Sequence, residues 1–253
     1  MKTKIISFGI HKGGVGKTTS TVNVGSILAK KGYRVLLIDM DSQANLTKSL
    51  IAGTPENDNY LAMTGKEDEL PITNIGDNLD IVPSSLALAK AEIELTSVFS
   101  RETMLKRLIE PIKSNYDFIL IDCPTSLGLL TQNAFTASNE IIVPIIAEPL
   151  PYEGLENIFP FTDKIRIYLN PDAHITGILI TRWEPTRITK DFREGIINKY
   201  KELVFNTHIR KNITLADAPL THQNIVDFSP KSNGAADYIA FTDELLQRLH
   251  ITK

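Results

Sequence analysis

Short apolar runs recur along the chain, and they alternate with longer segments whose apolar positions are spaced for a helix. The runs are continuous rather than alternating, which is typical of strands covered on both faces; they span residues 4–9, 34–39, 78–83, 116–122, 140–144 and 175–181. Helical spacing is clearest over residues 17–31, where Gly32 would end the helix. Residues 85–97 and 101–113 are also predicted to be helical.

Strands that alternate with helices predict an α/β fold with a doubly wound, mostly parallel sheet and helices on both faces. Ligands of such sheets bind at the carboxyl ends of the strands. No repeat, low-complexity tract or linker interrupts the 253 residues, so we expect one domain over residues 1–253. Residues 52–78, rich in Gly, Asn and Asp, are expected to form a surface insertion.

Composition narrows the class of protein. Hydrophobic residues make up 42% and charged residues 23%, as in soluble globular proteins. The net charge of −3 excludes a wholly basic nucleic-acid coat protein, although not a local basic face. Cys123 is the only cysteine, so no intrachain disulfide can form and a cytosolic location is favoured. The N-terminus leads straight into an apolar run instead of a signal peptide, and the longest apolar run, residues 141–147, is far shorter than the ~20 residues of a membrane helix.

The stretch "IHKGGVGKTT", residues 10–19, indicates a phosphate-binding loop. Its end, Gly16-Lys17-Thr18, fits the formula G-x-x-x-x-G-K-[ST], but His11 stands where the first glycine is expected. Glycines let backbone N–H groups turn toward phosphate oxygens, and the following helix adds its positive dipole end. Lys17 would reach the β- and γ-phosphates and Thr18 would bind Mg²⁺. The alternative is an ordinary glycine turn between a strand and a helix.

Three aspartates follow predicted strands and would meet at the same edge of the sheet. Asp39 and Asp41 end the second run, two residues apart, so in an extended chain both would point the same way. Asp122 ends a buried run, as a Walker B aspartate does. Carboxylates here could hold Mg²⁺ or its waters, and one could position an attacking water. Any single aspartate at a strand end could instead be a turn former.

These segments resemble the motifs of a known family. Residues 12–19 resemble the deviant Walker A motif of the ParA/MinD family of P-loop ATPases, residues 35–47 its second motif and residues 119–124 its Walker B motif. Residues 126–134 resemble the helix that follows Walker B. Residues 216–219 and 229–235 resemble C-terminal motifs of the ParA (Soj-like) partition branch. The similarity extends over nearly the whole chain.

The resemblance implies a role for the additional lysine, Lys12. In that family it reaches across a nucleotide-sandwich homodimer to phosphates held by the partner subunit; the alternative is a solvated loop lysine. It also implies catalytic roles for Lys12, Lys17 and Asp41, with Asp41 activating water. The implied ATP site contains Lys12, Gly13, Gly14, Val15, Gly16, Lys17, Thr18, Thr19 and Asn212, the last at the adenine, and the implied Mg²⁺ site contains Thr18, Asp41 and Asp122.

A basic region lies near the C-terminus. Residues 182–211 hold eight basic and four acidic residues, a local excess of four positive charges. A solvated helix face around residues 188–201 would explain this. ParA proteins, however, bind DNA without sequence preference through this region, although Thr214 stands where Soj-like proteins carry an arginine. The resemblance therefore implies DNA-binding residues here, namely Arg187, Lys190, Arg210, Lys211 and Lys231.

The expected function is ATP-dependent partitioning of a plasmid or chromosome, in the cytoplasm and on the nucleoid. With ATP and Mg²⁺ the homodimer would bind double-stranded DNA non-specifically, and a ParB-like adaptor protein would stimulate slow hydrolysis. A MinD-like regulator, or an orphan ParA that positions a non-DNA cargo or a division site, is the alternative. The C-terminal segment 236–250 is amphipathic but carries three acidic residues, so we expect it to pack on the core and not on a membrane. A nitrogenase-reductase-type protein would need more cysteines than Cys123. A tyrosine-kinase relative would need a tyrosine-rich tail. A scaffold protein that does not hydrolyse ATP is a further alternative.

Overall fold

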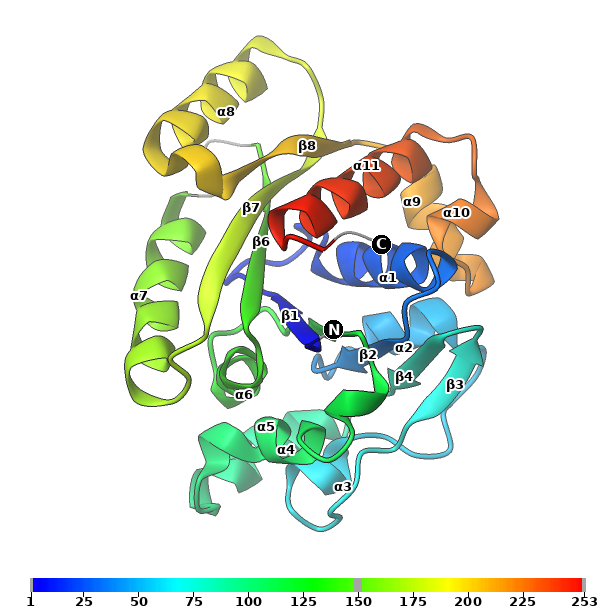
Figure 1. The fold of residues 1–253 in the computed structure, drawn as a ribbon, viewed down its shortest axis with the longest axis vertical. Helices are drawn as coiled ribbons and strands as arrows, with labels where there is room; N and C mark the ends of the chain where they lie inside the picture. The colour runs from blue at the N-terminus through cyan, green and yellow to red at the C-terminus, as the bar shows by residue number, and fades with distance from the viewer. Residues whose placement is uncertain (1, 148–151, 252–253) are drawn as a thin grey trace.

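An eight-stranded sheet forms the centre of the computed structural model, which describes residues 2–147 and 152–251. The strand order is β3-β4-β2-β5-β1-β6-β7-β8 (Figure 1). Seven strands are parallel, and they are β1 (Lys4–Phe8), β2 (Val35–Asp39), β4 (Leu79–Val82), β5 (Phe118–Asp122), β6 (Glu140–Ile146), β7 (His174–Trp183) and β8 (Val204–Arg210). The edge strand β3 (Thr73–Gly76) is antiparallel. The α/β fold with a mostly parallel sheet is confirmed.

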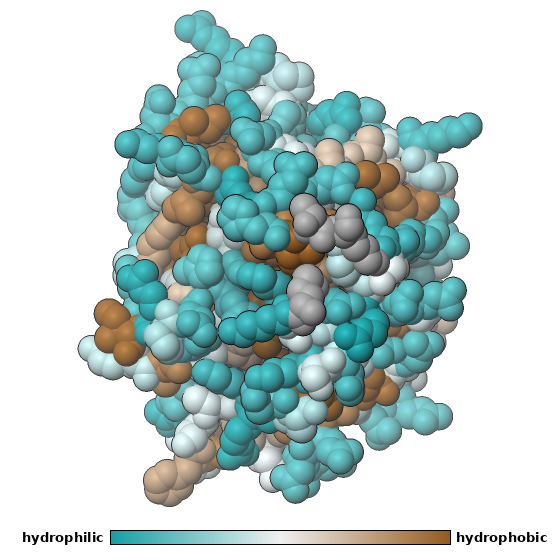
Figure 2. All heavy atoms as spheres, viewed as in Figure 1, coloured by the Kyte–Doolittle hydropathy of each residue, from teal (hydrophilic) through white to brown (hydrophobic). Residues whose placement is uncertain are grey.

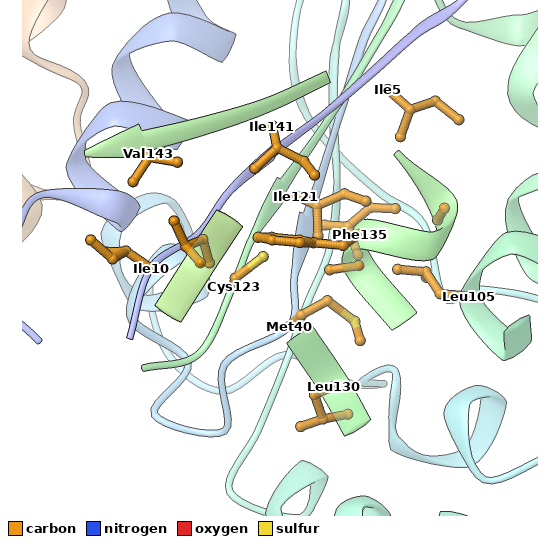
Figure 3. Packing of buried hydrophobic residues seen from close by; sticks show 14 of the residues in the cluster. Ile5, Ile10, Met40, Leu105, Ile121, Cys123, Leu130, Phe135, Ile141 and Val143 are labelled. Atoms are coloured by element: carbon orange, nitrogen blue, oxygen red, sulfur yellow. The ribbon is translucent and has the colours of Figure 1, made fainter. Parts of the chain in front are cut away.

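Helices cover both faces of the sheet (Figure 1). One face carries α1 (Lys17–Lys30) and α11 (Asn233–Arg248), and the other carries α4 (Leu88–Glu94), α5 (Met104–Ile109), α6 (Leu129–Ala137) and α7 (Tyr152–Tyr168). Successive residues of a strand point to opposite faces of the sheet, so each face has its own hydrophobic core. Ile5 belongs to one of these cores and Ile6 to the other. Figure 3 shows the core on the α6 side, where Phe135 lies among side chains of several strands. Cys123 is fully buried there, and burial raises the pKa of its thiol.

The connections place a switch point at β1. From β1 the chain moves outward through α1 to β2 and β4, returns through β5 and then builds β6, β7 and β8 on the other side. Strand β1 therefore lies between β5 and β6. The strands on its two sides are connected in opposite directions along the sheet. Ligands of open α/β sheets bind at the carboxyl ends of strands beside such a point. The glycine-rich loop lies there, directly after β1.

All six strands expected from the apolar runs are present, but other elements escape the pattern. The missed elements are β3, β8, the 17-residue helix α7 and the short helices α2 (Asn45–Leu50), α3 (Tyr60–Met63), α9 (Thr214–Asp217) and α10 (Ile225–Phe228). The helices expected over 85–97 and 101–113 are shorter than predicted, because 3₁₀ turns occupy residues 95–97, 101–103 and 113–115. Segment 52–78 contains α3 and the largely exposed β3 at the sheet edge.

The C-terminal helix packs as expected. Helix α11 buries Tyr238, Phe241 and Leu245 against the sheet and α1. Of its acidic residues, Asp237 is also buried, and Asp237 and Glu244 both accept hydrogen bonds from backbone N–H groups of β8. Among the described residues, no helix combines the length and apolar character needed to cross a bilayer. On the face shown in Figure 2, hydrophilic side chains cover most of the surface and hydrophobic ones form small groups. Helix α8 (Arg187–Tyr200) also lies near the surface, with Phe192 and Ile196 turned into the core.

Candidate active site

The loop between β1 and α1 depends on glycines. Gly14 has φ of 71° and Gly16 has φ of 87°, the left-handed region that most side chains avoid. Gly16 also lies close to β7, because a Cβ there would be 3.5 Å from the Thr181 side chain. The Thr181 hydroxyl donates to the carbonyl oxygen of Val15 at 2.8 Å. The sheet therefore holds the loop, with Gly13 and Gly14 exposed at its tip and Val15 buried beneath it.

The two lysines of the loop differ in position. Lys17 has a relative exposure of only 6%, and its Nζ donates to the carbonyl oxygen of Lys12 at 2.9 Å. Burial lowers the pKa of Lys17, and Asp122 acts in the opposite direction. A buried ammonium without a carboxylate bonded to it is suited to an incoming anion. Lys12 is half-buried.

Thr18 and Asp122 are brought together, as predicted for a Mg²⁺ site. The Thr18 hydroxyl donates to Oδ2 of Asp122 at 2.6 Å, while Oδ1 of Asp122 is buried and has no hydrogen-bond partner among the described residues. Burial raises the pKa of Asp122 well above its usual range, and the neighbouring Asp39 raises it further. A hydroxyl beside a buried carboxylate oxygen that lacks a partner fits a hydrated Mg²⁺ ion.

Asp39 and Asp41 have different surroundings. Asp39 is fully buried, where its Oδ2 accepts from the Thr47 backbone N–H at 2.9 Å and from the Thr47 hydroxyl at 2.7 Å. Burial raises the pKa of Asp39 to about 6, against the lowering by these hydrogen bonds. Asp41 instead lines the pocket beside Lys17 and Thr18. Strand β2 ends at Asp39, and the two carboxylates bond to different partners, although both lie near enough to Asp122 to raise its pKa. That the two side chains point the same way stays a prediction.

A protein-only metal site is absent from the described residues, since no three His, Cys, Asp or Glu side chains converge on one. An ion here would take its other ligands from the Thr18 hydroxyl, water and phosphate oxygens. Mg²⁺ is usually bound in this way, with one or two carboxylates and several waters. Asp122 bonds to Thr18 and Asp41 lines the same pocket, while a role of either at the ion stays a prediction.

A pocket of about 730 Å³ extends from the glycine-rich loop to the connection between β8 and α9. Its volume is within the range of small-molecule sites. From the phosphate loop it is lined by Gly14, Gly16, Lys17, Thr18 and Thr19, and at the far end by residues 209–213 and Tyr238, among others. Asn212, predicted at the adenine, is among them. Its Oδ1 accepts from the backbone N–H of Thr214 at 2.9 Å and from the Thr214 hydroxyl at 2.6 Å.

Sequence reasoning missed several residues of this pocket, among them Lys48 and Arg182. Arg182 is exposed and has φ of 50°, a costly backbone conformation for a non-glycine residue. Thr181 before it bonds to Val15, and the carbonyl oxygen of Trp183 after it accepts from the Lys211 N–H at 3.0 Å, so the strained residue is held on both sides. Polar residues at the carboxyl end of β7 are the signal that could have identified it.

The predicted DNA-binding residues fall into separate segments. Arg187 and Lys190 are exposed at the start of α8, and Lys231 is exposed between α10 and α11. Figure 1 shows α8 and the α10–α11 connection on opposite sides of α11. Arg210 forms an ion pair with Asp237 at 2.6 Å, and Lys211 forms one with Glu184 at 3.0 Å. The last two residues are thus already engaged by carboxylates of this chain.

Comparison with known proteins shows the family of this chain. The family model described as AAA domain matches residues 3–175. The sporulation initiation inhibitor protein Soj of Bacillus subtilis is 39% identical over 96% of this chain and 98% of its own length. The chromosome-partitioning ATPase Soj of Treponema pallidum is 34% identical over 97% and 98%.

A solved structure shows what this fold can hold. Cobyrinic acid a,c-diamide synthase from Mycobacterium smegmatis, with a bound ATP analog and magnesium, has a TM-score of 0.85 at 29% identity, covering 98% of this chain and 96% of that one. The family model covers more than half of the chain, and both Soj proteins match nearly its whole length. The chain therefore belongs to the AAA-domain family and, within the P-loop ATPases, to the ParA/MinD family.

Proposed function

We propose that this chain is a partition ATPase that forms an ATP-dependent sandwich dimer, binds DNA non-specifically and separates plasmid or chromosome copies. One observation carries the proposal: similarity to the Soj proteins continues past residue 175, through the segment that holds the basic residues and closes the nucleotide pocket. Residues 1–253 act as one domain in this scheme. In this scheme the protein is located in the cytoplasm and associates with the nucleoid.

Hydrolysis of ATP with Mg²⁺ is the chemistry of the site. Thr18 and Asp122 would hold the ion, which when bound neutralises charge on the β- and γ-phosphate oxygens. The Lys17 ammonium leaves the Lys12 carbonyl for phosphate oxygens, and the loop N–H groups bind others. Asp41, at the pocket wall, orients the attacking water.

Lys12 acts on the site of a second copy. Support comes from the pocket itself: Lys12 is not among the described residues that line it, although Lys17 and Thr18 are. A cation supplied by a partner stabilises the charge that develops on the transferred phosphoryl oxygens. Two cationic loops repel each other unless phosphates lie between them, so dimerisation depends on bound ATP.

The dimer then doubles the basic surface that meets DNA. Arg187, Lys190 and Lys231 are exposed and supply the first contacts. Arg210 and Lys211 contribute only if phosphate replaces Asp237 and Glu184, their present partners. A ParB-like protein bound to the cargo stimulates hydrolysis and releases the dimer. A non-DNA cargo or a division site is the alternative target for the same cycle.

Binding to random-sequence duplex DNA tests this proposal. We expect binding with ATP and much weaker binding with ADP or without nucleotide. The double variant Arg187→Ala/Lys190→Ala should lower the salt dependence by about 1.8 in the log–log slope per chain, since each phosphate contact contributes about 0.9. Lys90→Ala, an exposed lysine on α4, is the matched control and should change nothing. Equal binding in all three nucleotide states would overturn the proposal.

A further inference from the structure

The backbone of Asp41 is held from both sides by hydrogen bonds. Its N–H donates to Oδ1 of Asp39 at 3.1 Å, and its carbonyl oxygen accepts from the Ser84 hydroxyl at 2.9 Å. Its carboxylate accepts from the Gln43 N–H at 2.9 Å. Both peptide groups flanking Asp41 are therefore fixed, and so is the direction of its side chain.

Thr47 closes these contacts into a ring. Its hydroxyl donates to Oδ2 of Asp39 at 2.7 Å and accepts from the Ser84 N–H at 2.9 Å. Asp39 ends β2, Thr47 lies in α2, and Ser84 lies two residues after β4. Three elements thus meet behind one pocket residue.

The members of the ring are shielded from water. Asp39 is fully buried, and Thr47 and Ser84 have relative exposures of 2% and 1%. Hydrogen bonds in such surroundings are strong because water does not compete for them. Of the ring, Asp41 is the member that lines the nucleotide pocket.

We propose that Thr47 and Ser84 are positioning residues of the ATPase. Through Asp39 and the Asp41 backbone they hold the Asp41 carboxylate where the attacking water must lie. A shift of about 1 Å in such a group costs about 100-fold in rate. This inference rests on the proposed role of Asp41 in hydrolysis.

Matched variants test the inference. Thr47→Val keeps the shape and removes the hydroxyl, Thr47→Ser keeps the hydroxyl, and Ser84→Ala removes only the bond to the Asp41 carbonyl. We expect Thr47→Val and Ser84→Ala to lower kcat by about 10- to 100-fold, with ATP affinity within twofold of the parent. Thr47→Ser should recover most of the rate. Thr162→Val is the control, because Thr162 is a buried threonine of α7 whose hydroxyl donates to the Ile158 carbonyl oxygen of the same helix.

Steady-state phosphate release, nucleotide titration and thermal melting of each variant give the answer. Parental kcat in both Thr47→Val and Ser84→Ala would overturn the inference, as would an equal loss in Thr47→Ser. Ser84→Ala serves if Thr47→Val fails to fold, since it leaves the Thr47–Asp39 bonds in place. Asp41→Ala distinguishes failure of this inference from failure of the proposed role of Asp41. An inactive Asp41→Ala, with Thr47→Val and Ser84→Ala both fully active, removes only this inference. An active Asp41→Ala removes the proposed role of Asp41 as well.

Discussion

Replacing Asp122 by asparagine should stabilise the nucleotide-free protein while abolishing Mg²⁺-dependent hydrolysis. Asp122 is fully buried and is paired in register with the equally buried Asp39 on β2. Within the part of the chain that the structure describes, one of its oxygens has no hydrogen-bond partner. With strands ~4.8 Å apart and an effective dielectric constant of about 20, two such charges repel by about 3 kcal/mol. Lys17 offsets part of this, so we expect a net gain of about 2 kcal/mol, or about 4–8 °C in Tm for a chain of this size.

The gain from Asp122→Asn should depend on pH. An acid whose folded pKa lies above its unfolded value binds protons more tightly in the folded state, so its destabilising effect grows as pH rises through that window. The pKa of Asp122 is raised by burial and then by Asp39, so the difference in Tm should be largest at high pH and shrink as the pH falls.

Thermal melts of the apo protein between pH 5 and 9, with and without the substitution, measure this gain. Asp117→Asn is the control, because Asp117 directly precedes the same strand. There burial alone would raise the carboxyl pKa, but hydrogen bonds from Arg34 outweigh burial and lower it. Asp117→Asn should therefore destabilise at neutral pH, with an effect that fades in acid. A lower Tm for Asp122→Asn at every pH, or a gain independent of pH, would refute the reasoning.

Two further predictions concern groups on β7. His174 donates to Glu140, and this hydrogen bond raises the pKa of His174. The stabilisation of the folded state by this contact is present below pH ~6.5 and should be lost as the pH rises through the folded pKa. The loss should be at most about 1 kcal/mol after solvent screening. His174→Gln should abolish that slope in pH-dependent melts, and an unchanged slope would contradict this. Arg182→Gly should leave the unfolding free energy equal or raise it by about 1 kcal/mol, because glycine adopts φ of 50° without strain, while weakening ATP binding several-fold. Arg182→Lys keeps both the charge and the strain, so nucleotide titration and melting of the two variants should separate these effects.

The phosphate end of the site could be predicted because its residues are contiguous. Residues 12–19 carry the glycines, the lysines and Thr18 in one loop, and the rule that parallel strands end at a shared edge brings Asp122 to it. The six strands could be found because burial on both faces leaves unbroken apolar runs. Strand β8 escaped because it is an edge strand, in which Asn206 and Thr207 interrupt the apolar run.

Side-chain partners that are distant in the sequence could not be predicted from the local sequence pattern. Asp39 and Asp41 look alike in sequence, yet one is bonded to Thr47 and the other lines the pocket. Ser84 is 37 residues from Thr47, and no spacing rule connects them. The ion pair between Arg210 and Asp237 likewise forms only when α11 packs beside β8. Charge counting therefore located a basic region without showing which cations are already engaged.

A mixing experiment tests most directly whether Lys12 acts across a dimer. Lys12→Ala and Asp41→Ala should each hydrolyse ATP slowly when assayed alone. In a mixed dimer, the site of the Lys12→Ala chain keeps Asp41 and receives Lys12 from its partner, so one site of two is complete. Phosphate release should then rise above the sum of the separate variants as the two are titrated together with ATP. At equal concentrations it should approach roughly a quarter of the parental rate, because about half of randomly formed dimers are mixed and each of these has one complete site of two. A mixture no more active than that sum would contradict donation of Lys12 in trans.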